Sequence, residues 1–244
     1  MPRFFLEVAY KGTKYAGFQI QQNANTIQAE VEKALSMYFR TAFELTGSSR
    51  TDSGVHALQN FFHFDFPVED SATVSNSVYR LNSILPHDIV IKSICEVADN
   101  AHCRFNAVSR LYEYAIYNRK DPFLNDRAYY YPYPLNLDKL NEAAAIIKST
   151  ENFKSFSKKN TQVQTHLCNI EESVWFVDGN RIIYRVKGNR FLRGMVKGLV
   201  GTMLKMGTGK IDLDEFIKIV DSHNCSLADF SAPSHGLILV AVGY

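Results

Sequence analysis

The chain has 244 residues, 46% of them hydrophobic, with 27 Lys+Arg against 25 Asp+Glu. This composition is typical of a globular protein with a packed core, and the length leaves open one large domain or two small ones. The near balance of charge says little about partners, so a polyanion would have to meet a local basic patch. Four scattered cysteines, no signal-peptide segment and no bilayer-spanning apolar run predict a soluble, cytoplasmic protein with no membrane contact.

The first half of the chain alternates strand and helix patterns. In chain order it predicts a strand, a helix, a short strand, a second aromatic-rich strand, a helix ended by Pro86 and a closing strand. These are Arg3–Tyr10, Thr26–Phe39, Ala42–Leu45, Asn60–Phe66, the helix marked by Val74, Val78, Leu81 and Leu85, and Ile89–Val97.

The second half begins the same pattern again. It predicts a strand, a helix, a hairpin across Asp178-Gly179-Asn180, two helices and a last strand. These are Leu111–Tyr117, Asp138 to about Lys148, Val174–Val177 with Arg181–Val186, Phe191–Leu204, Leu213–Val220 and Leu237–Val242. Asp212 and Glu215 are spaced as a capping box for the second of these helices.

Each half therefore reads as β-α-β-β-α-β, the order of a ferredoxin-like, split βαβ unit. We expect an α+β fold of two such subdomains, residues 1–105 and 106–244, joined near 106–110.

The loop Gly47–His56, sequence GSSRTDSGVH, lies between two predicted apolar strands and carries Arg50, Asp52 and His56. One interpretation is an ordinary solvent-exposed loop with no catalytic role. A Ser–His–Asp hydrolase lacks the G-x-S-x-G elbow, and an aspartic protease would need a second carboxylate from a homodimer. The remaining interpretation, a lone ionised aspartate used as nucleophile or base, requires a basic group from elsewhere in the chain.

The predicted helix Phe191–Leu204 offers that basic group. Arg190, Arg193 and Lys197 are spaced i, i+3 and i+7, and Arg185 and Lys187 precede them without an acidic neighbour in sequence. The ordinary interpretation is a solvated helix face with snorkelling side chains. The functional interpretation is a phosphate-binding track, which Lys154, Lys158 and Lys159 could extend.

Two further groups of residues bear on chemistry. Tyr112 and Tyr114 should share one face of their strand, with Tyr117 on the other, and such tyrosines either pack in a core or stack on a base. The histidines and cysteines show no metal-ligand spacing, and the adjacent His102 and Cys103 should point to opposite faces of an extended segment. We therefore expect no metal site.

Several motifs, in this order, resemble the TruA family of tRNA pseudouridine synthases over nearly the whole chain. The most specific is the string Ser49–Ala57, SRTDSGVHA, with the R-T-D-x-G-V-H signature. The others are individually weak but collinear: Tyr10–Gln19, Thr26–Gln28, Leu85–Asp88, His102–Phe105, Arg110–Tyr112, Phe153–Phe156, Asn189–Lys197 and Ala232–Leu237.

The resemblance implies isomerisation of uridine to pseudouridine in the anticodon stem-loop of tRNA, at positions 38–40, by a homodimer with a cleft between merged subdomains. It implies Asp52 as the catalytic aspartate, Tyr112 as the active-site tyrosine and Lys197 at the position of the arginine that pairs with the aspartate. Residues in the matching motifs and the basic patch are expected to bind the substrate: Arg50, Arg104, Arg110, Lys187, Arg190, Arg193 and Leu237.

This chain departs from the family pattern at a few positions. Lys197 replaces the usual arginine, keeping the charge but not the two-pronged pair, and Gln164-Thr165 replaces an Arg-Thr element. The reaction is neither redox nor hydrolysis, so the resemblance implies no cofactor. The alternative function is that of a non-catalytic RNA-binding protein with two RRM-like units, although the RRM signature is missing.

Overall fold

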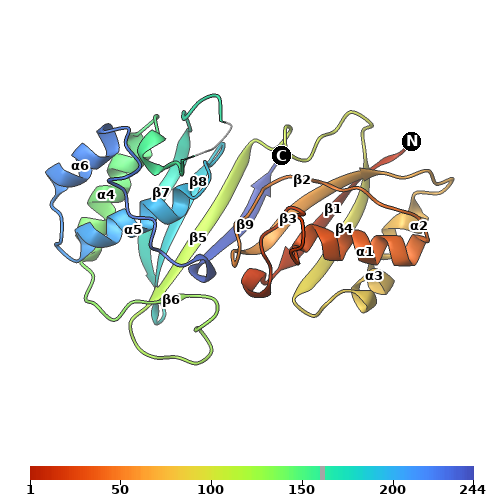
Figure 1. Ribbon diagram of the computed structural model, residues 1–244, viewed down its shortest axis with the longest axis horizontal. Coiled ribbons are helices and arrows are strands. Elements are labelled where there is room, and N and C mark those ends of the chain that lie inside the picture. The colour runs from red at the N-terminus through yellow and green to blue at the C-terminus, as the bar shows by residue number, and fades with distance from the viewer. Residues whose placement is uncertain (160–162) are drawn as a thin grey trace. The chain divides into compact units, whose positions relative to one another are not determined.

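The computed structural model describes residues 1–159 and 163–244. This part of the chain divides into two compact units, one of Met1–Val108 with Leu239–Tyr244 and one of Ser109–Ile238. They are called unit 1 and unit 2 below, and both combine a β-sheet with helices in an α+β fold (Figure 1). Among the described helices, none is both long and apolar enough to cross a membrane.

Unit 1 has the split βαβ arrangement. Its elements are β1 (Arg3–Tyr10), α1 (Ile27–Phe39), β2 (Thr46–Gly47), β3 (His56–Asp65), α2 (Ala72–Ser75), α3 (Val78–Ile84) and β4 (Ile89–Val97), with a 3₁₀ turn at Gly12–Lys14. The sheet order is β4-β1-β3, and β2 pairs with β3. All of these pairs are antiparallel, so β3 lies between the parallel strands β1 and β2, which α1 connects.

The helices of unit 1 pack against each other over its sheet (Figure 1). Every second residue of β1 is buried, and α1 buries Ile27, Val31 and Leu35 on the matching stripe, because strands repeat every two residues and helices every 3.6. Thr26 caps α1 by accepting a hydrogen bond from the Ala29 backbone N–H. The predicted bounds of β1, α1 and β4 are confirmed.

Three predictions in unit 1 are wrong in detail. The strand expected at Asn60–Phe66 starts four residues earlier, at His56, and ends at Asp65. The short strand expected at Ala42–Leu45 is found at Thr46–Gly47, because side chains of α1 bind the backbone of Leu45. Gln28 Nε2 donates to the Leu45 carbonyl at 2.8 Å, and Glu32 Oε1 accepts from its N–H at 2.9 Å. The single helix expected before Pro86 is two short helices, since Ser77 Oγ bonds the Val74 carbonyl at their junction.

Unit 2 repeats the split βαβ arrangement. Its elements are β5 (Ser109–Tyr117), β6 (Tyr129–Tyr130), α4 (Leu137–Ser149), β7 (Ile170–Asp178), β8 (Arg181–Gly188), α5 (Met195–Gly207) and α6 (Leu213–Asp221), with 3₁₀ turns η2 (Lys154–Phe156) and η3 (Ser234–Gly236). β8 lies between β5 and β7 and is antiparallel to both, while β6 pairs parallel with β5. The sheet of unit 2 is therefore mixed.

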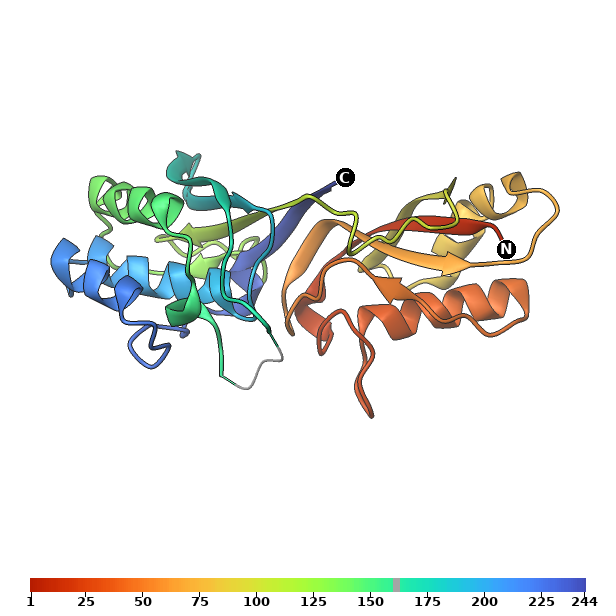
Figure 2. The ribbon, with the colours of Figure 1, turned by 90° about the horizontal axis from the view of Figure 1, so that it is seen from above.

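The helices of unit 2 form a layer on its sheet. α4 packs on β7, and α5 lies beside α4 (Figure 2). The predicted α4, hairpin and α6 are confirmed within a few residues, and the capping box of Asp212 and Glu215 is present.

The last strand, β9 (Leu237–Gly243), starts in unit 2, but from Leu239 onward it belongs to unit 1 and pairs with β3. Chain order had placed it with the second set.

The predicted helix Phe191–Leu204 is wrong over its first turn. Gly194 has φ +73, a left-handed conformation that an α-helix does not admit, and α5 starts at Met195. Arg190 and Arg193 therefore precede the helix, and the basic face at i, i+3 and i+7 does not exist. Leu192 is buried as a helical residue would be, which is why its periodicity misled the prediction.

Candidate active site

Asp52 starts a tight turn between β2 and β3. The Val55 N–H donates to the Asp52 carbonyl at 3.2 Å, and Gly54, third in the turn, has φ +78. A positive φ at this position is what a type II turn requires, and it favours glycine. Thr51 and Val55 are buried on either side, whereas Asp52 is half-buried and Ser53 exposed. The turn thus presents a carboxylate from an otherwise buried loop.

A buried hydrogen-bond network holds the start of this loop. Asn60 of β3 donates to the Ser49 carbonyl at 2.9 Å and to the Tyr10 hydroxyl at 3.2 Å, and its Oδ1 accepts from the Ser49 N–H at 3.3 Å. The Tyr10 hydroxyl is also 2.8 Å from Thr51 Oγ1. Buried, satisfied networks of this kind specify one loop conformation.

The segment after β1 supports the other side of the loop. The Phe18 N–H donates to the Thr51 carbonyl at 3.1 Å, and the Gly54 N–H donates to the Tyr15 carbonyl at 3.3 Å. Gly12 is so close that an added Cβ would lie 2.0 Å from the Val55 carbonyl oxygen. The segment Tyr10–Gln19, one of the family-like motifs, therefore packs against the Asp52 loop and hydrogen-bonds to it.

His56 does not fit the role of a triad base. It starts β3 with 4% of its surface exposed, and its Nδ1 accepts the Gly12 N–H at 3.0 Å. This bond fixes His56 as part of the scaffold that joins the Gly12 segment to the loop, which removes the support for a Ser–His–Asp hydrolase.

Replacing Asn60 by alanine should loosen the Asp52 loop. The change leaves the buried Ser49 N–H and carbonyl without their partner, so we expect the free energy of unfolding to fall by about 2–4 kcal/mol. Urea denaturation measures this loss. Ser49→Ala is the matched control, because its buried hydroxyl has no hydrogen-bond partner among the described residues, and its removal should change stability by less than about 1 kcal/mol. Equal losses in both variants would contradict the assignment.

Tyr112 lies on β5 in unit 2, where it is 8% exposed and its ring meets that of Phe191 edge-on with centroids 5.1 Å apart. Tyr114 shares its face but is fully buried and donates to the Pro233 carbonyl at 2.8 Å. Tyr117 packs on the opposite face with Ala115 and Ile183. Of the two tyrosines on the first face, Tyr114 is a core residue and Tyr112 keeps some exposed surface.

Lys197 lies on α5, half-buried, and its Nζ donates to Ser234 Oγ at 3.2 Å. Ser234 belongs to the motif Ala232–Leu237, which the Tyr114 bond to Pro233 fastens to β5. A Cβ on Gly236 would lie 2.7 Å from Tyr114 Cζ, so glycine permits this close approach. Two motifs far apart in sequence therefore meet at Lys197. Leu237, at the end of the motif, is buried with 6% exposure.

The basic patch of unit 2 is only partly uncompensated, contrary to the expectation from sequence. Arg185 pairs with Glu113 at 2.7 Å across β5 and β8, and Lys187 pairs with Glu171 at 2.6 Å. These carboxylates come from neighbouring strands, so sequence proximity did not reveal them. Arg193 is exposed, and Arg190 is half-buried.

The other predicted substrate-binding residues are distributed over both units. In unit 2 the Arg110 guanidinium donates to the Asn189 carbonyl at 2.9 Å, beside Arg190. In unit 1 Arg50 is exposed, and the Arg104 guanidinium lies 5.7 Å from the centroid of the Phe105 ring. Asp52 thus belongs to unit 1, whereas Tyr112 and Lys197 belong to unit 2.

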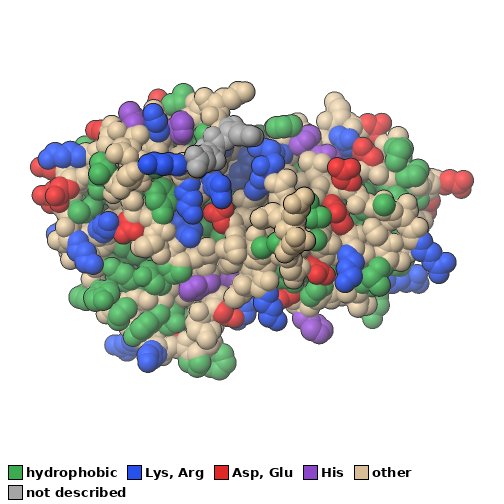
Figure 3. All heavy atoms as spheres, viewed as in Figure 1, with side chains coloured by type: hydrophobic (Ala, Val, Ile, Leu, Met, Phe, Trp, Pro, Cys, Tyr) green, Lys and Arg blue, Asp and Glu red, His purple; other side chains and the backbone are tan. Residues whose placement is uncertain are grey.

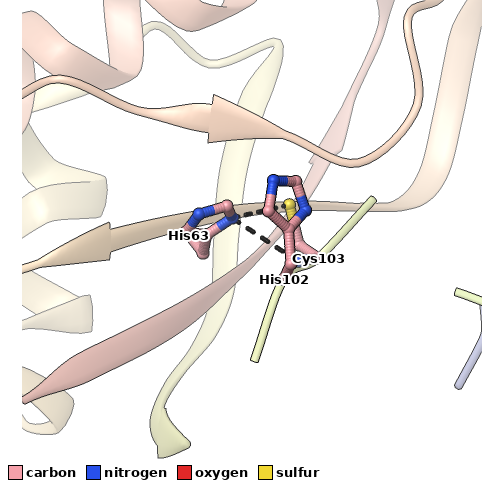
Figure 4. A group of neighbouring side chains, drawn as sticks. All are labelled: His63, His102 and Cys103. Carbon is pink, nitrogen blue, oxygen red and sulfur yellow. Dashed lines mark hydrogen bonds between the residues drawn. The ribbon is translucent and has the colours of Figure 1, made fainter. Parts of the chain in front are cut away.

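His63, His102 and Cys103 form an unexpected cluster in unit 1, with one potential metal-ligand atom from each lying within 4.8 Å of the others (Figure 4). The prediction that His102 and Cys103 point apart is wrong, because residues 103–105 form a turn rather than an extended segment. His63 Nδ1 lies 3.1 Å from Cys103 Sγ, and His102 Nδ1 accepts the Arg104 and Phe105 N–H groups. A metal at these nitrogens would displace those bonds, so we assign the cluster a structural role.

Stability should depend on pH through His63. Burial, with smaller contributions from His102 and Arg3, lowers the pKa of His63 from 6.5 to about 4. Between these values the unfolded chain binds a proton that the folded protein excludes, so stability falls as pH drops from 6.5 towards 4, by at most about 3 kcal/mol. Urea denaturation across this range checks it. His63→Gln should flatten the pH dependence, and an unchanged profile in that variant would contradict the assignment.

The geometry can now be set beside known proteins. A sequence profile described as tRNA pseudouridine synthase matches residues 7–106 and 143–244. The chain is 40% identical to tRNA pseudouridine synthase A of Porphyromonas gingivalis over 246 residues, covering 100% of this chain and 98% of the relative. The enzymes of that name from Bacteroides fragilis and Staphylococcus aureus (strain MRSA252) are 40% and 36% identical, covering 99% and 97% of this chain and 96% and 90% of each relative.

The chain belongs to the TruA family of tRNA pseudouridine synthases. Its activity is that of a tRNA pseudouridine synthase, an isomerase, which sets aside the non-catalytic RNA-binding alternative. The profile match includes the Asp52 loop and Lys197 but not residues 107–142, so it leaves Tyr112 and Arg110 outside.

Sequence reasoning missed the residues that position this TruA-family site. Asn60 contacts the Asp52 loop, Phe191 contacts Tyr112, and Ser234 contacts Lys197. Asn60 carried a usable signal, since an amide in an otherwise aromatic strand needs buried partners. Phe191 and Ser234 lie in the matching motifs Asn189–Lys197 and Ala232–Leu237, but the sequence did not reveal their contacts, because their partners are distant in sequence.

Proposed function

We propose that the enzyme isomerises uridines at positions 38–40 in the anticodon stem-loop of tRNA, with Asp52 as the catalytic aspartate. The observation that supports this most directly is the turn at Asp52. Hydrogen bonds from β1, β3 and the Gly12–Phe18 segment hold the loop, while its carboxylate remains half-exposed. A charged group held rigidly by its scaffold is what catalysis at a fixed sugar carbon needs.

The reaction breaks the glycosidic bond between the sugar and N1 of uracil, turns the base and forms a bond from the sugar to carbon 5, which loses its proton while N1 gains one. Substrate and product are isomers, so no electrons are exchanged with a second molecule and no water is consumed. The Asp52 carboxylate either adds to the sugar or abstracts a sugar proton to leave a glycal. Both routes need a carboxylate near the sugar. In the first, the ester to Asp52 breaks when the new carbon–carbon bond forms, and in the second, the abstracted proton returns to the sugar, so Asp52 is regenerated.

Residues of unit 2 complete the proposed site. Lys197 supplies a positive charge that attracts the aspartate carboxylate, and excluding water strengthens that attraction. Tyr112 packs on the target base after it leaves its stack, because a phenol ring offers a flat apolar face. We propose Arg50, Arg104, Arg110, Lys187, Arg190, Arg193 and Leu237 as the residues that bind the surrounding tRNA.

The larger arrangement follows from the family resemblance. We propose that the sheets of the two subdomains merge around a central cleft, that the enzyme is a homodimer, and that it acts in the cytoplasm. The subdomains proposed from sequence are residues 1–105, carrying the Asp52 loop, and 106–244, carrying Tyr112 and Lys197.

The direct test uses purified protein and a molar excess of unmodified tRNA transcript with uridines at 38, 39 and 40. We expect pseudouridine at these positions in more than one equivalent per enzyme, mapped by chemical derivatisation and sequencing. A transcript with cytidines at the three positions is the control and should yield no product. Product at other positions would overturn the proposed site selection while leaving the family activity in place.

A further inference from the structure

A second cationic feature lies in unit 2, separate from Tyr112 and Lys197. It is a pocket of about 320 Å³ formed by η2, the residues after it and the loop that follows α6. Its lining residues are Lys154, Ser157, Lys158, Lys159, His166, His223, Asn224 and Cys225, and we call it the lysine pocket. Figure 3 shows Lys, Arg and His side chains close together at the upper edge of unit 2 in that view.

The charge of the lysine pocket is not compensated locally. Its lining residues contribute three ammonium groups and two imidazoles and no carboxylate. In the part of the chain that the structure describes, none of its three lysines forms an ion pair, whereas Lys187 and Lys205 have Glu171 and Asp229 as partners. Like charges that lie close together without acidic partners repel one another, so binding an anion lowers the electrostatic free energy of the site.

Hydrogen bonds join the segments that form the pocket. The Phe153 N–H donates to the His166 carbonyl at 3.0 Å, which joins the Lys154 and His166 segments. Ser155 Oγ donates to the Val220 carbonyl at 3.0 Å and lies 3.3 Å from Ser222 Oγ, which joins them to the loop of His223. Phe153 is fully buried beneath. These hydrogen bonds hold the Lys154, His166 and His223 segments together, and such preorganisation favours binding.

The lysine pocket also adjoins the start of α5. The Lys158 N–H donates to the Arg193 carbonyl at 3.1 Å, and the Lys158 stem packs on Gly194, with Cγ 3.0 Å from the position of an added Cβ. Arg193, which is exposed, is therefore joined to the pocket through its backbone and precedes Lys197, the residue proposed above to supply the catalytic charge, by four residues.

We propose that the lysine pocket binds backbone phosphates of tRNA at a distance from the target uridine, which rests on the proposed function. Ammonium groups are compact point charges without the planar fork of arginine, so they suit phosphate oxygens of any sequence rather than the edge of a particular base. The pocket therefore adds affinity and orientation, whereas the chemistry takes place at Asp52.

The test compares two triple variants of equal charge change in the full-length enzyme. One removes the pocket lysines (Lys154→Gln, Lys158→Gln, Lys159→Gln), and the control removes three exposed lysines of α4 and α6 (Lys139→Gln, Lys148→Gln, Lys218→Gln). Glutamine keeps most of each side-chain stem. Thermal unfolding of both variants confirms that they fold.

For the pocket variant we expect tRNA affinity near 150 mM salt to fall by about 10–100-fold. The slope of log K against log[salt] should become shallower by about 2, since each lost phosphate contact removes about 0.7–0.9. The kcat at saturating tRNA should stay within about twofold of wild type. The control variant should keep the wild-type slope.

Equal slopes and affinities in the two variants would overturn the proposal. It would also be overturned if inorganic phosphate stabilised the wild type but not the pocket variant while both bound tRNA equally, because the pocket would then take a free anion. Failure of the proposed function is distinguishable, since wild-type enzyme would then bind tRNA without forming pseudouridine at positions 38–40.

Discussion

Asp52→Asn should bind tRNA with nearly wild-type affinity and form pseudouridine at least about 10³-fold more slowly. The amide is close in size to the carboxylate and preserves the turn, but it has no negative charge to act as nucleophile or base. The loop should survive because its hydrogen bonds come from Thr51, Ser49 and the backbone of Gly54 and Val55, not from the Asp52 carboxylate. Single-turnover product formation and equilibrium tRNA binding separate the two effects.

Ser53→Ala is the matched control for this experiment. It changes the neighbouring residue of the same turn, removing only the hydrogen bond from Ser53 Oγ to the Tyr15 carbonyl at 3.1 Å. We expect its turnover to stay within about threefold of wild type, the effect of a bond worth roughly 0.5 kcal/mol. Comparable turnover in Asp52→Asn and Ser53→Ala would remove Asp52 from the mechanism.

Lys197→Met should lower kcat by about 10²-fold while tRNA affinity changes by less than about threefold. The methionine fills similar space on the half-buried face of α5 but loses the charge proposed to act on the aspartate, and losses of this size are typical when one electrostatic contact to reacting groups is removed. Steady-state kinetics with unmodified tRNA, with kcat and KM determined separately, measures the change.

Two further variants show what kind of residue Lys197 is. Lys197→Arg restores the residue usual in the family and should recover most of the lost turnover, because it keeps the charge and adds a planar donor fork. Lys205→Met, on the same helix, removes the half-buried partner of Asp229 and should leave kcat near wild type. If Lys197→Met weakened tRNA binding and left kcat intact, Lys197 would be a phosphate contact only.

Elements with local signals could be predicted from the sequence. β1 is a compact apolar run and β4 has an alternating pattern, and the capping box of α6 consists of two residues three apart in sequence. Prediction failed where a tertiary contact or a backbone dihedral angle determines the local conformation. Side chains of α1 hold the backbone of Leu45 out of a strand, and the left-handed Gly194 delays α5 by a turn. These two effects depend on a contact and a dihedral angle that periodicity does not encode.

The same division holds for the candidate site. The sequence alone predicted the family and the reaction class, through the resemblance carried by the contiguous R-T-D-x-G-V-H string, and it singled out Asp52 as the proposed catalytic residue. The tertiary structure decided what supports it. Asn60 and Tyr10 lie 8 and 42 residues from Asp52, and Ser234 lies 37 residues from Lys197, yet their hydrogen bonds position the loop and the lysine. It also revealed that Arg185 and Lys187 are neutralised across strands, while the lysines near η2 line one pocket and have no ion-pair partner among residues 1–159 and 163–244. The physical reason is the same throughout: charge and hydrogen-bond complementarity depend on distance in space, and only the folded chain brings these partners within reach of one another.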